Sequence, residues 1–183
     1  MMWWAIGIIA ILAVVLVSIY NRLVTLRQRI KNAWAQIEVQ LKRRYDLIPN
    51  LVSTVKGYAA HEKETFERVV QARNAAISAQ GVQEQAGAEN MLSGALRQLF
   101  ALAESYPELK ANTNFLQLQE ELTNTEGKIA FSRQFYNDTV LKYNTAIQRF
   151  PAVMVAGMFG FHQEVYFNLD DEAEARQAVK VEF

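Results

Sequence analysis

The sequence predicts an all-α protein in which a single N-terminal transmembrane helix continues into an antiparallel bundle of long helices. Three observations lead to this fold class: an unbroken apolar run at the N-terminus, apolar residues spaced alternately three and four apart along most of the chain, and no credible β-strand. The 183 residues, of which 51% are hydrophobic, suit one domain with an accessory segment.

The apolar run predicts a membrane span. Between Trp3 and Tyr20 only Ser18 is clearly polar, and no charged residue precedes Arg22. As a helix rising about 1.5 Å per residue, this run would be about 27 Å long, close to the hydrocarbon thickness of a bilayer. We expect Trp3, Trp4, Tyr20 and Arg22 at the two membrane interfaces. A cleaved signal would need a basic start and a small-residue cleavage site, and neither is present. A buried core helix would have a polar face, which this run lacks.

The charges that follow the span predict its orientation. Residues 22–44 contain seven basic residues and one acidic residue, a balance of +6, so residues 45–183 carry −6 in a chain of zero net charge. Counting lysine and arginine therefore places the N-terminus outside and the domain in the cytoplasm. The basic stretch could bind anionic head groups, but fixing the orientation is the preferred reading, because only Arg22 to Lys31 lie within reach of the lipid. The resulting domains are residues 1–21 as anchor, 22–167 as cytoplasmic helical bundle and 168–183 as acidic tail.

The segment "RRYDLIPNLV" predicts a junction between two helices. Arg43 and Arg44 would end the first rod, where their charge suits the helix dipole, and Asp46 would cap the second. Pro49 lacks an N–H, a loss that is harmless in the first turn of a helix. The alternative is a recognition patch. The six candidate residues of this junction motif are Arg43, Arg44, Tyr45, Asp46, Pro49 and Asn50.

Further helices follow the predicted junction. Ser78 to Ala88 is polar and contains glycine, which predicts a loop, and we expect Pro107 to close the next helix. Asn112 or Asn114 offers an N-cap for a long helix that reaches Phe150.

That long helix shows strict alternation of three and four from Phe115 to Phe150, as in a bundle or coiled coil. Its later positions carry serine, threonine and tyrosine, whose buried hydroxyls need partners. Phe131 and Phe135 widen the apolar stripe and predict contact with a second neighbour. The apolar segment after Pro151 is too short to span a bilayer, so it is either a docked terminal helix, which we prefer, or a surface-lying segment.

The residues that carry chemistry are sparse. The chain has no cysteine, and His61 lacks a second histidine one turn later, so a zinc-peptidase motif is incomplete. Glu120, Glu121 and Glu126 fit a solvated helix face better than an acid pair. We therefore expect no catalytic residue, no metal and no cofactor. The neutral overall charge gives no indication of nucleic-acid binding.

Three long segments carry a family resemblance: "YNRLVTLRQRIKNAWAQIEVQLKRRYDLIPNLVSTVKGYAAHEKET", "ENMLSGALRQLFALAESYPELKANTNFLQLQEELTNTEGKIAFSRQFYNDTVLKYN" and "FPAVMVAGMFGF…YF". In order and over nearly the whole chain, they resemble the LemA family of bacterial membrane proteins. The resemblance implies an N-terminal anchor followed by an antiparallel helical bundle, no established enzymatic activity, and a role in the bacterial envelope.

Two classes of function follow. The first is a membrane-anchored scaffold or adaptor in the bacterial cytoplasmic membrane, without enzymatic activity. The alternative is a hydrolytic or lipid-handling enzyme that uses Asp46, His61 or the Glu121 and Glu126 pair, or an accessory subunit of a membrane peptidase system. The expected partners are membrane lipids, other membrane proteins and further copies of the chain. Gly7, Ala10 and Ala13 form a small-residue ridge on the span that would allow such copies to approach.

Overall fold

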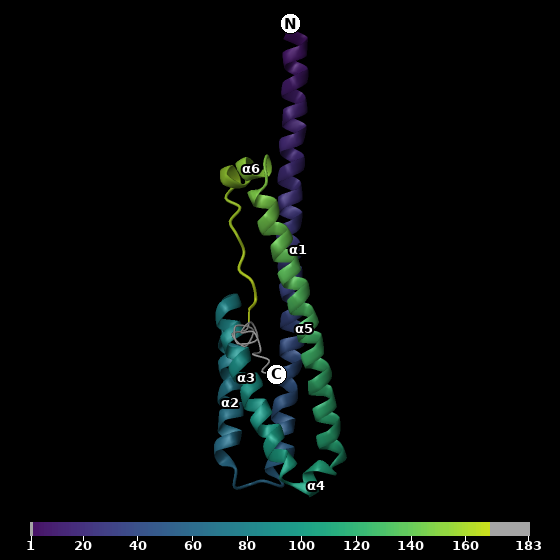
Figure 1. Cartoon of the computed structure of the whole chain (residues 1–183), viewed down its shortest axis with the longest axis vertical. Helices are drawn as coiled ribbons and strands as arrows, with labels where there is room; N and C mark the ends of the chain where they lie inside the picture. Colours follow the sequence, from purple (N-terminus) through teal and green to yellow (C-terminus); the bar gives the residue numbers. More distant parts are fainter. Residues whose placement is uncertain (1, 169–183) are drawn as a thin grey trace, which may run out of the picture. The chain divides into compact units, whose positions relative to one another are not determined.

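The computed structural model describes residues 2–168, and within that range it contains helices and no strand. The helices are α1 (Met2–Lys56), α2 (Lys63–Ser78), α3 (Gly81–Glu104), α4 (Pro107–Lys110), α5 (Thr113–Gln148) and α6 (Ala152–Phe159) (Figure 1). The predicted all-α fold class is confirmed. The predicted acidic tail lies outside the described residues, except for Asn168 at its start.

The chain forms two compact units, and the two longest helices each contribute to both. Unit 1 comprises Met1–Ile37 and Ser132–Tyr166, so it contains the start of α1, the end of α5 and all of α6. Unit 2 comprises Glu38–Phe131 and residues 167–168, and therefore holds the end of α1, the start of α5, and α2 to α4. Each unit is described separately below.

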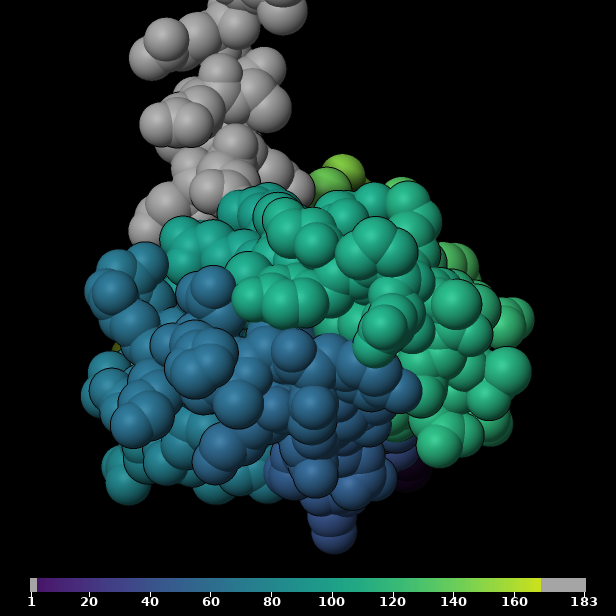
Figure 2. Space-filling model, turned by 90° about the horizontal axis from the view of Figure 1, so that it is seen from below, coloured from purple at the N-terminus to yellow at the C-terminus, as the bar shows by residue number. Residues whose placement is uncertain are grey.

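In unit 2, the end of α1 packs against α2, α3 and the start of α5. The end-on view in Figure 2 shows blue side chains of the second half of α1 and of α2 in contact with teal ones from α3 to α5. Burying one such aliphatic side chain completely contributes roughly 1.5–3 kcal/mol, so this core accounts for the association of the helices. Its fully buried members are Ile48, Leu51, Val55, Val69, Leu92, Leu99 and Leu109.

The predicted junction at Arg43 to Asn50 is wrong, because α1 runs without interruption to Lys56 and contains Pro49 in its interior. Ile48 and Leu51, on either side of the proline, are both 0% exposed. Packing of this face therefore outweighs the hydrogen bond that the proline removes. Asp46 is exposed in mid-helix and caps nothing.

The predicted loop at Ser78 to Ala88 is also wrong. α3 begins at Gly81, so only Ala79 and Gln80 separate it from α2. Gly81 has a φ of 78°, a left-handed conformation that glycine adopts without strain. The polar residues extend α3 because every third or fourth position, beginning with Gln85 and Ala88, is buried in the core.

The ends of the following helices match the sequence in part. α3 stops at Glu104, and Pro107 opens the short α4 instead of closing α3. Asn112 is the predicted cap of α5, because its Oδ1 accepts a hydrogen bond of 3.0 Å from the backbone N–H of Phe115. That cap fixes where the long helix begins.

The seam of α5 is confirmed over most of its length. Phe115, Leu122, Ile129, Tyr136 and Tyr143 are all buried. The buried hydroxyls find partners close by: those of Thr125 and Thr139 donate to the carbonyl groups of the preceding turn at 2.7 and 2.8 Å.

Three phenylalanines near the seam do not pack as predicted. Phe131 is 71% exposed and Phe135 is 46% exposed, so they form an outward-facing pair instead of contacting a second neighbour. Phe150 is 81% exposed because α5 ends two residues earlier, at Gln148.

In unit 1, the segment after α6 returns along α5. The hydroxyl of Tyr136 donates to the carbonyl of Val165 at 2.9 Å. The side-chain amide of Asn144 donates to the carbonyl of Glu164 and accepts from its N–H, both at 2.9 Å. These contacts hold the segment against α5, and the preferred docking of the terminal helix is confirmed for two α6 residues, Val155 and Ala156, which are buried.

Candidate functional site

A buried polar cluster of unit 2 is centred on Arg44, in the second half of α1. Its side chain is 4% exposed, and its guanidinium contacts Glu89 Oε2 at 3.0 Å, with the Glu89 side chain also 4% exposed. The same group contacts Glu126 Oε2 of α5 at 3.2 Å and donates to Ser93 Oγ of α3 at 2.9 Å. A buried arginine is costly unless it is paired and hydrogen-bonded, and here three partners from two helices satisfy it.

The other oxygen of Glu89 is satisfied as well. Its Oε1 accepts hydrogen bonds from the hydroxyl of Tyr45 and, at 3.1 Å, from the amide of Gln85. Gln85 Nε2 also lies 2.9 Å from the Tyr45 hydroxyl and 3.1 Å from the carbonyl of Ala76 in α2. The network therefore joins α1, α2, α3 and α5.

Burial changes the pKa of two groups in the network, Glu89 and Tyr45. Burial raises the pKa of Glu89, while the hydrogen bond from Tyr45 and the charge of Arg44 act in the opposite direction. Burial, followed by the adjacent Glu89, raises the pKa of the Tyr45 hydroxyl far above its usual range. Tyr45 consequently keeps its proton and acts as a hydrogen-bond donor.

Arg73 of α2 donates the hydrogen bond that Pro49 removes from α1. A proline inside a helix leaves the carbonyl four residues earlier without its N–H partner, and here that carbonyl belongs to Tyr45. The Nε of Arg73 donates to this carbonyl at 2.8 Å. The side chain thus replaces the missing helical hydrogen bond and ties α2 to the point where α1 lacks one.

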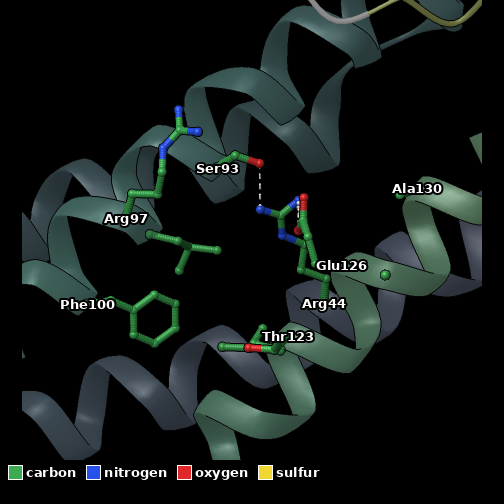
Figure 3. A pocket seen from close by; sticks show the side chains of 10 residues that line it. Arg44, Ser93, Arg97, Phe100, Thr123, Glu126 and Ala130 are labelled. Atoms are coloured by element: carbon green, nitrogen blue, oxygen red, sulfur yellow. Dashed lines mark hydrogen bonds and ion pairs between the residues drawn. The ribbon is translucent and has the colours of Figure 1, made fainter. Parts of the chain in front are cut away.

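An open pocket of about 380 Å³ adjoins Arg44 and is lined by side chains of α1, α3 and α5. Figure 3 shows Arg44 between Ser93 and Glu126, with Arg97, Phe100 and Thr123 around the remaining space. Neither Tyr45 nor Glu89 lines this pocket. The two groups with displaced pKa values therefore do not face the space in which a substrate could sit.

The structure separates the six junction residues into two sets. Arg44 and Tyr45 enter the network, whereas Arg43, Asp46, Pro49 and Asn50 lie on the exposed face of α1. The candidate interface residues on α1 are exposed, with Trp3 and Trp4 at 83% and 81%.

The residues of the enzymatic alternative are not brought together into a metal site. Within residues 2–168, no group of three or more histidine, cysteine, aspartate or glutamate side chains could hold a metal ion. His61 is exposed in the connection between α1 and α2.

Sequence reasoning missed Glu89, Gln85 and Arg73, although the sequence contained a signal for the pairing of Glu89 with Arg44. Arg44 occupies a core position in the series Ile37, Leu41, Arg44, Ile48, Leu51 and Val55. Glu89 does the same in the series Gln85, Glu89, Leu92, Leu96 and Leu99. Charged residues are rarely buried unless they are paired. A single base in one apolar series and a single acid in the other could therefore have indicated that Arg44 and Glu89 form an ion pair.

Comparison with known proteins adds a family and several relatives. The model of the LemA family matches residues 33–183. Magnetosome protein MamQ of Magnetospirillum gryphiswaldense is 25% identical over 192 residues, which cover 90% of this chain and 71% of that protein. Magnetosome protein MamQ 2 of Paramagnetospirillum magneticum is 26% identical, over 88% of this chain and 68% of its own. Protein LemA of Metamycoplasma hominis is 27% identical over 155 residues, which cover 82% of this chain and 69% of that protein.

Proposed function

Since this chain belongs to the LemA family, we propose that it is a membrane-anchored helical scaffold or adaptor of the bacterial envelope that acts through protein contacts and without catalysis. The proposal places it in the cytoplasmic membrane as a single-pass protein. Its N-terminus faces outward and its bundle lies in the cytoplasm, as the basic residues after the span indicate.

The continuity of α1 is the observation that carries this proposal. Residues 3–18 are exposed throughout, and the helix has a mean hydropathy of 2.4 over its most apolar stretch. Among residues 2–168, α1 is the helix that is long and apolar enough to cross a membrane. The same helix then buries Leu23 and Ile37 within unit 1 and Ile48 within unit 2. A helix that is both anchor and core element attaches the bundle directly to the membrane span.

The buried network around Arg44 supports a structural function. General acid-base catalysis needs a titratable group within hydrogen-bond reach of the substrate. Glu89 and Tyr45 instead direct their polar atoms at each other and at Arg44 and Gln85. The names of the MamQ relatives describe a location, the magnetosome, and not a reaction.

Exposed aromatic side chains on α5 supply a surface for protein contacts. Phe131 and Phe135 are four residues apart and therefore lie on one face of the helix. Large exposed aromatic residues are enriched at the centres of protein interfaces, so this pair is where we expect a partner to bind.

Site-specific photo-crosslinking in living cells tests the scaffold against the enzymatic alternative. A photoreactive amino acid at Phe131 should yield discrete protein adducts, whereas the same residue at Glu67, which is exposed on α2, should not. Metal analysis of the purified full chain serves as the second readout. Stoichiometric zinc or iron, together with no adduct from Phe131, would favour the hydrolytic enzyme.

A further inference from the structure

α6 is an apolar helix that buries only a small part of its surface. Its sequence, AVMVAGMF, has no charged or polar side chain, yet Val153, Met154, Met158 and Phe159 are 45% to 76% exposed. Phe150, just before the helix, is 81% exposed. Such a concentration of exposed apolar side chains marks a site of interaction with another molecule or a membrane.

Contacts within unit 1 place α6 beside the end of the predicted span. The ring of Tyr20 lies 4.9 Å from that of Phe159 and 5.7 Å from that of Phe161, measured between centroids. Arg27, two turns further along α1, stacks over the Phe161 ring at 5.0 Å. Figure 1 shows α6 beside α1 at this level. The exposed apolar side chains therefore lie where the apolar run of α1 ends and its basic stretch begins.

A groove of about 850 Å³ between α1 and α5 opens at the same place. Ile19, the last aliphatic residue of the span, and Phe150 both line it. No acidic residue within residues 2–168 lines it, whereas four basic residues do: Arg22, Arg29, Lys142 and Arg149. Among the described residues, none of these four forms an ion pair.

The charge pattern of the groove identifies its ligand. Four bases that form no ion pair with another described residue select an anion. The aliphatic and aromatic side chains at the rim select a ligand that also has an apolar part. An anionic phospholipid combines both properties, and bases near a membrane surface attract such lipids. The lipid needs no route from solvent, because Ile19 belongs to the helix that crosses the bilayer.

We propose that this groove binds the head group of an anionic phospholipid, and that the exposed side chains of α6 insert beside its acyl chains in the same leaflet. α6 then lies in the membrane surface as a second attachment point for the bundle. The proposal rests on the membrane anchoring of α1 but not on the scaffold role, so the test below can fail while the crosslinks from Phe131 are still obtained.

The test uses the full chain in nanodiscs of phosphatidylcholine with a minor fraction of phosphatidylglycerol. After extraction, native mass spectrometry counts each lipid that stays bound. The wild type should retain phosphatidylglycerol in preference to phosphatidylcholine. Lys142→Gln with Arg149→Gln should lower this preference roughly 25-fold, since each base near the surface contributes roughly fivefold. Lys142 lies on α5 and Arg149 directly follows it, so both substitutions leave the basic flank of the span unchanged.

Lys56→Gln with Lys128→Gln is the matched control. It removes the same charge from two exposed residues that do not line the groove, and the preference should change by less than roughly twofold, because salt screens distant charges. An equal loss in both double variants, or no preference in the wild type, would overturn the proposal. If the glutamine variant does not fold, Lys142→Arg with Arg149→Lys should retain the preference, and its loss would also overturn the proposal.

A second comparison distinguishes a lipid from a soluble anion. Met154→Ser with Met158→Ser should weaken retention of phosphatidylglycerol, because these side chains would contact acyl chains and not a free anion. Inorganic phosphate, added in solution, should not displace the lipid. If phosphate displaced it fully and the methionine variant retained it unchanged, the groove would be a site for soluble anions, contrary to the proposal.

Discussion

At Arg44, a charge that burial makes costly is compensated by partners from two other helices. The guanidinium lies 3.0 Å from Glu89 and 3.2 Å from Glu126, but only Glu89 is buried with it. The Glu126 side chain is 52% exposed, so water screens its attraction to Arg44. The two carboxylates thus contribute very differently to stability although their distances are similar.

Glu89→Ala should therefore lower the free energy of unfolding by about 3 kcal/mol, because it leaves a buried guanidinium without its main counter-charge. Glu126→Ala should cost less than about 1 kcal/mol. Urea denaturation of the full chain in detergent, followed by circular dichroism, measures both. Equal losses in the two variants would contradict the assignment of Glu89 as the principal partner. The double variant Arg44→Met with Glu89→Leu should lose less unfolding free energy than the sum of the losses in Arg44→Met alone and Glu89→Leu alone.

Tyr136 provides a pH-dependent test in unit 1. Burial, followed by the charge of Glu164, raises the pKa of its hydroxyl from the ordinary 10.0 to about 12. The raised value means that its contribution to stability is present below pH 10 and is lost as the pH rises through 12. In alkaline titrations followed by tyrosinate absorbance, the difference between wild type and Tyr136→Phe should have its midpoint near pH 12. A difference midpoint near 10 would mean that the hydroxyl is solvated and not bonded to Val165.

Among elements, α1 shows where sequence reasoning succeeded and where it failed. The apolar spacing through Leu23, Ile30 and Ile37 predicted one rod, and these residues are buried along it. The predicted break at Pro49 was wrong because the carbonyl that accepts no helical bond is satisfied by Arg73, a residue 28 positions away from Tyr45. A local rule for proline cannot anticipate a partner from another helix.

The start of α3 and the cap of α5 show the same difference between local propensity and tertiary packing. The glycines and glutamines of the segment from Ser78 to Ala88 favour a loop locally, but burial of Gln85 and Ala88 against the core makes most of it the start of α3. The cap at Asn112, by contrast, was predictable because its bond to Phe115 spans only three residues. Tertiary packing decided the elements that local propensity misjudged.

A double-mutant cycle tests the role of Arg73 in keeping α1 continuous. Arg73→Met should cost about 1.5 kcal/mol or more in the wild type, because the Tyr45 carbonyl loses a charged donor. In a Pro49→Ala background the helix regains its own N–H donor, so the same change should cost clearly less. Urea denaturation of the four proteins gives the coupling free energy. Additive effects would show that the Arg73 contact does not compensate for the proline.

At the level of the whole molecule, the buried stripe of α1 limits how copies could associate. Leu23, Ile30, Ala33 and Ile37 are at most 5% exposed within a single chain, so this stripe is covered by the chain itself. A homo-oligomer, if it forms, must use other surfaces. The small-residue face of the span at Gly7, Ala10 and Ala13 is exposed and allows close approach of two helices.

We expect cysteine crosslinking in membranes to occur at Ala13→Cys and not at Ala33→Cys. The first position is exposed on the span, whereas the second is 0% exposed inside unit 1. The natural chain contains no cysteine, so each substitution reports a single position. Crosslinks at neither Ala10→Cys nor Ala13→Cys, in correctly inserted protein, would favour a monomer.

The central claim, that the bundle is held at the cytoplasmic face of the membrane to bind other proteins, is tested most directly by proximity labelling in living cells. A biotin ligase that requires cytoplasmic ATP is fused after Phe183, and a matched control carries the same ligase on residues 1–31 alone. The account predicts strong labelling, with a defined set of membrane proteins enriched for the full chain over the control, and loss of that enrichment in Phe131→Ser with Phe135→Ser. Identical labelled sets for the full chain and the control, or no labelling because the ligase lies outside, would contradict it.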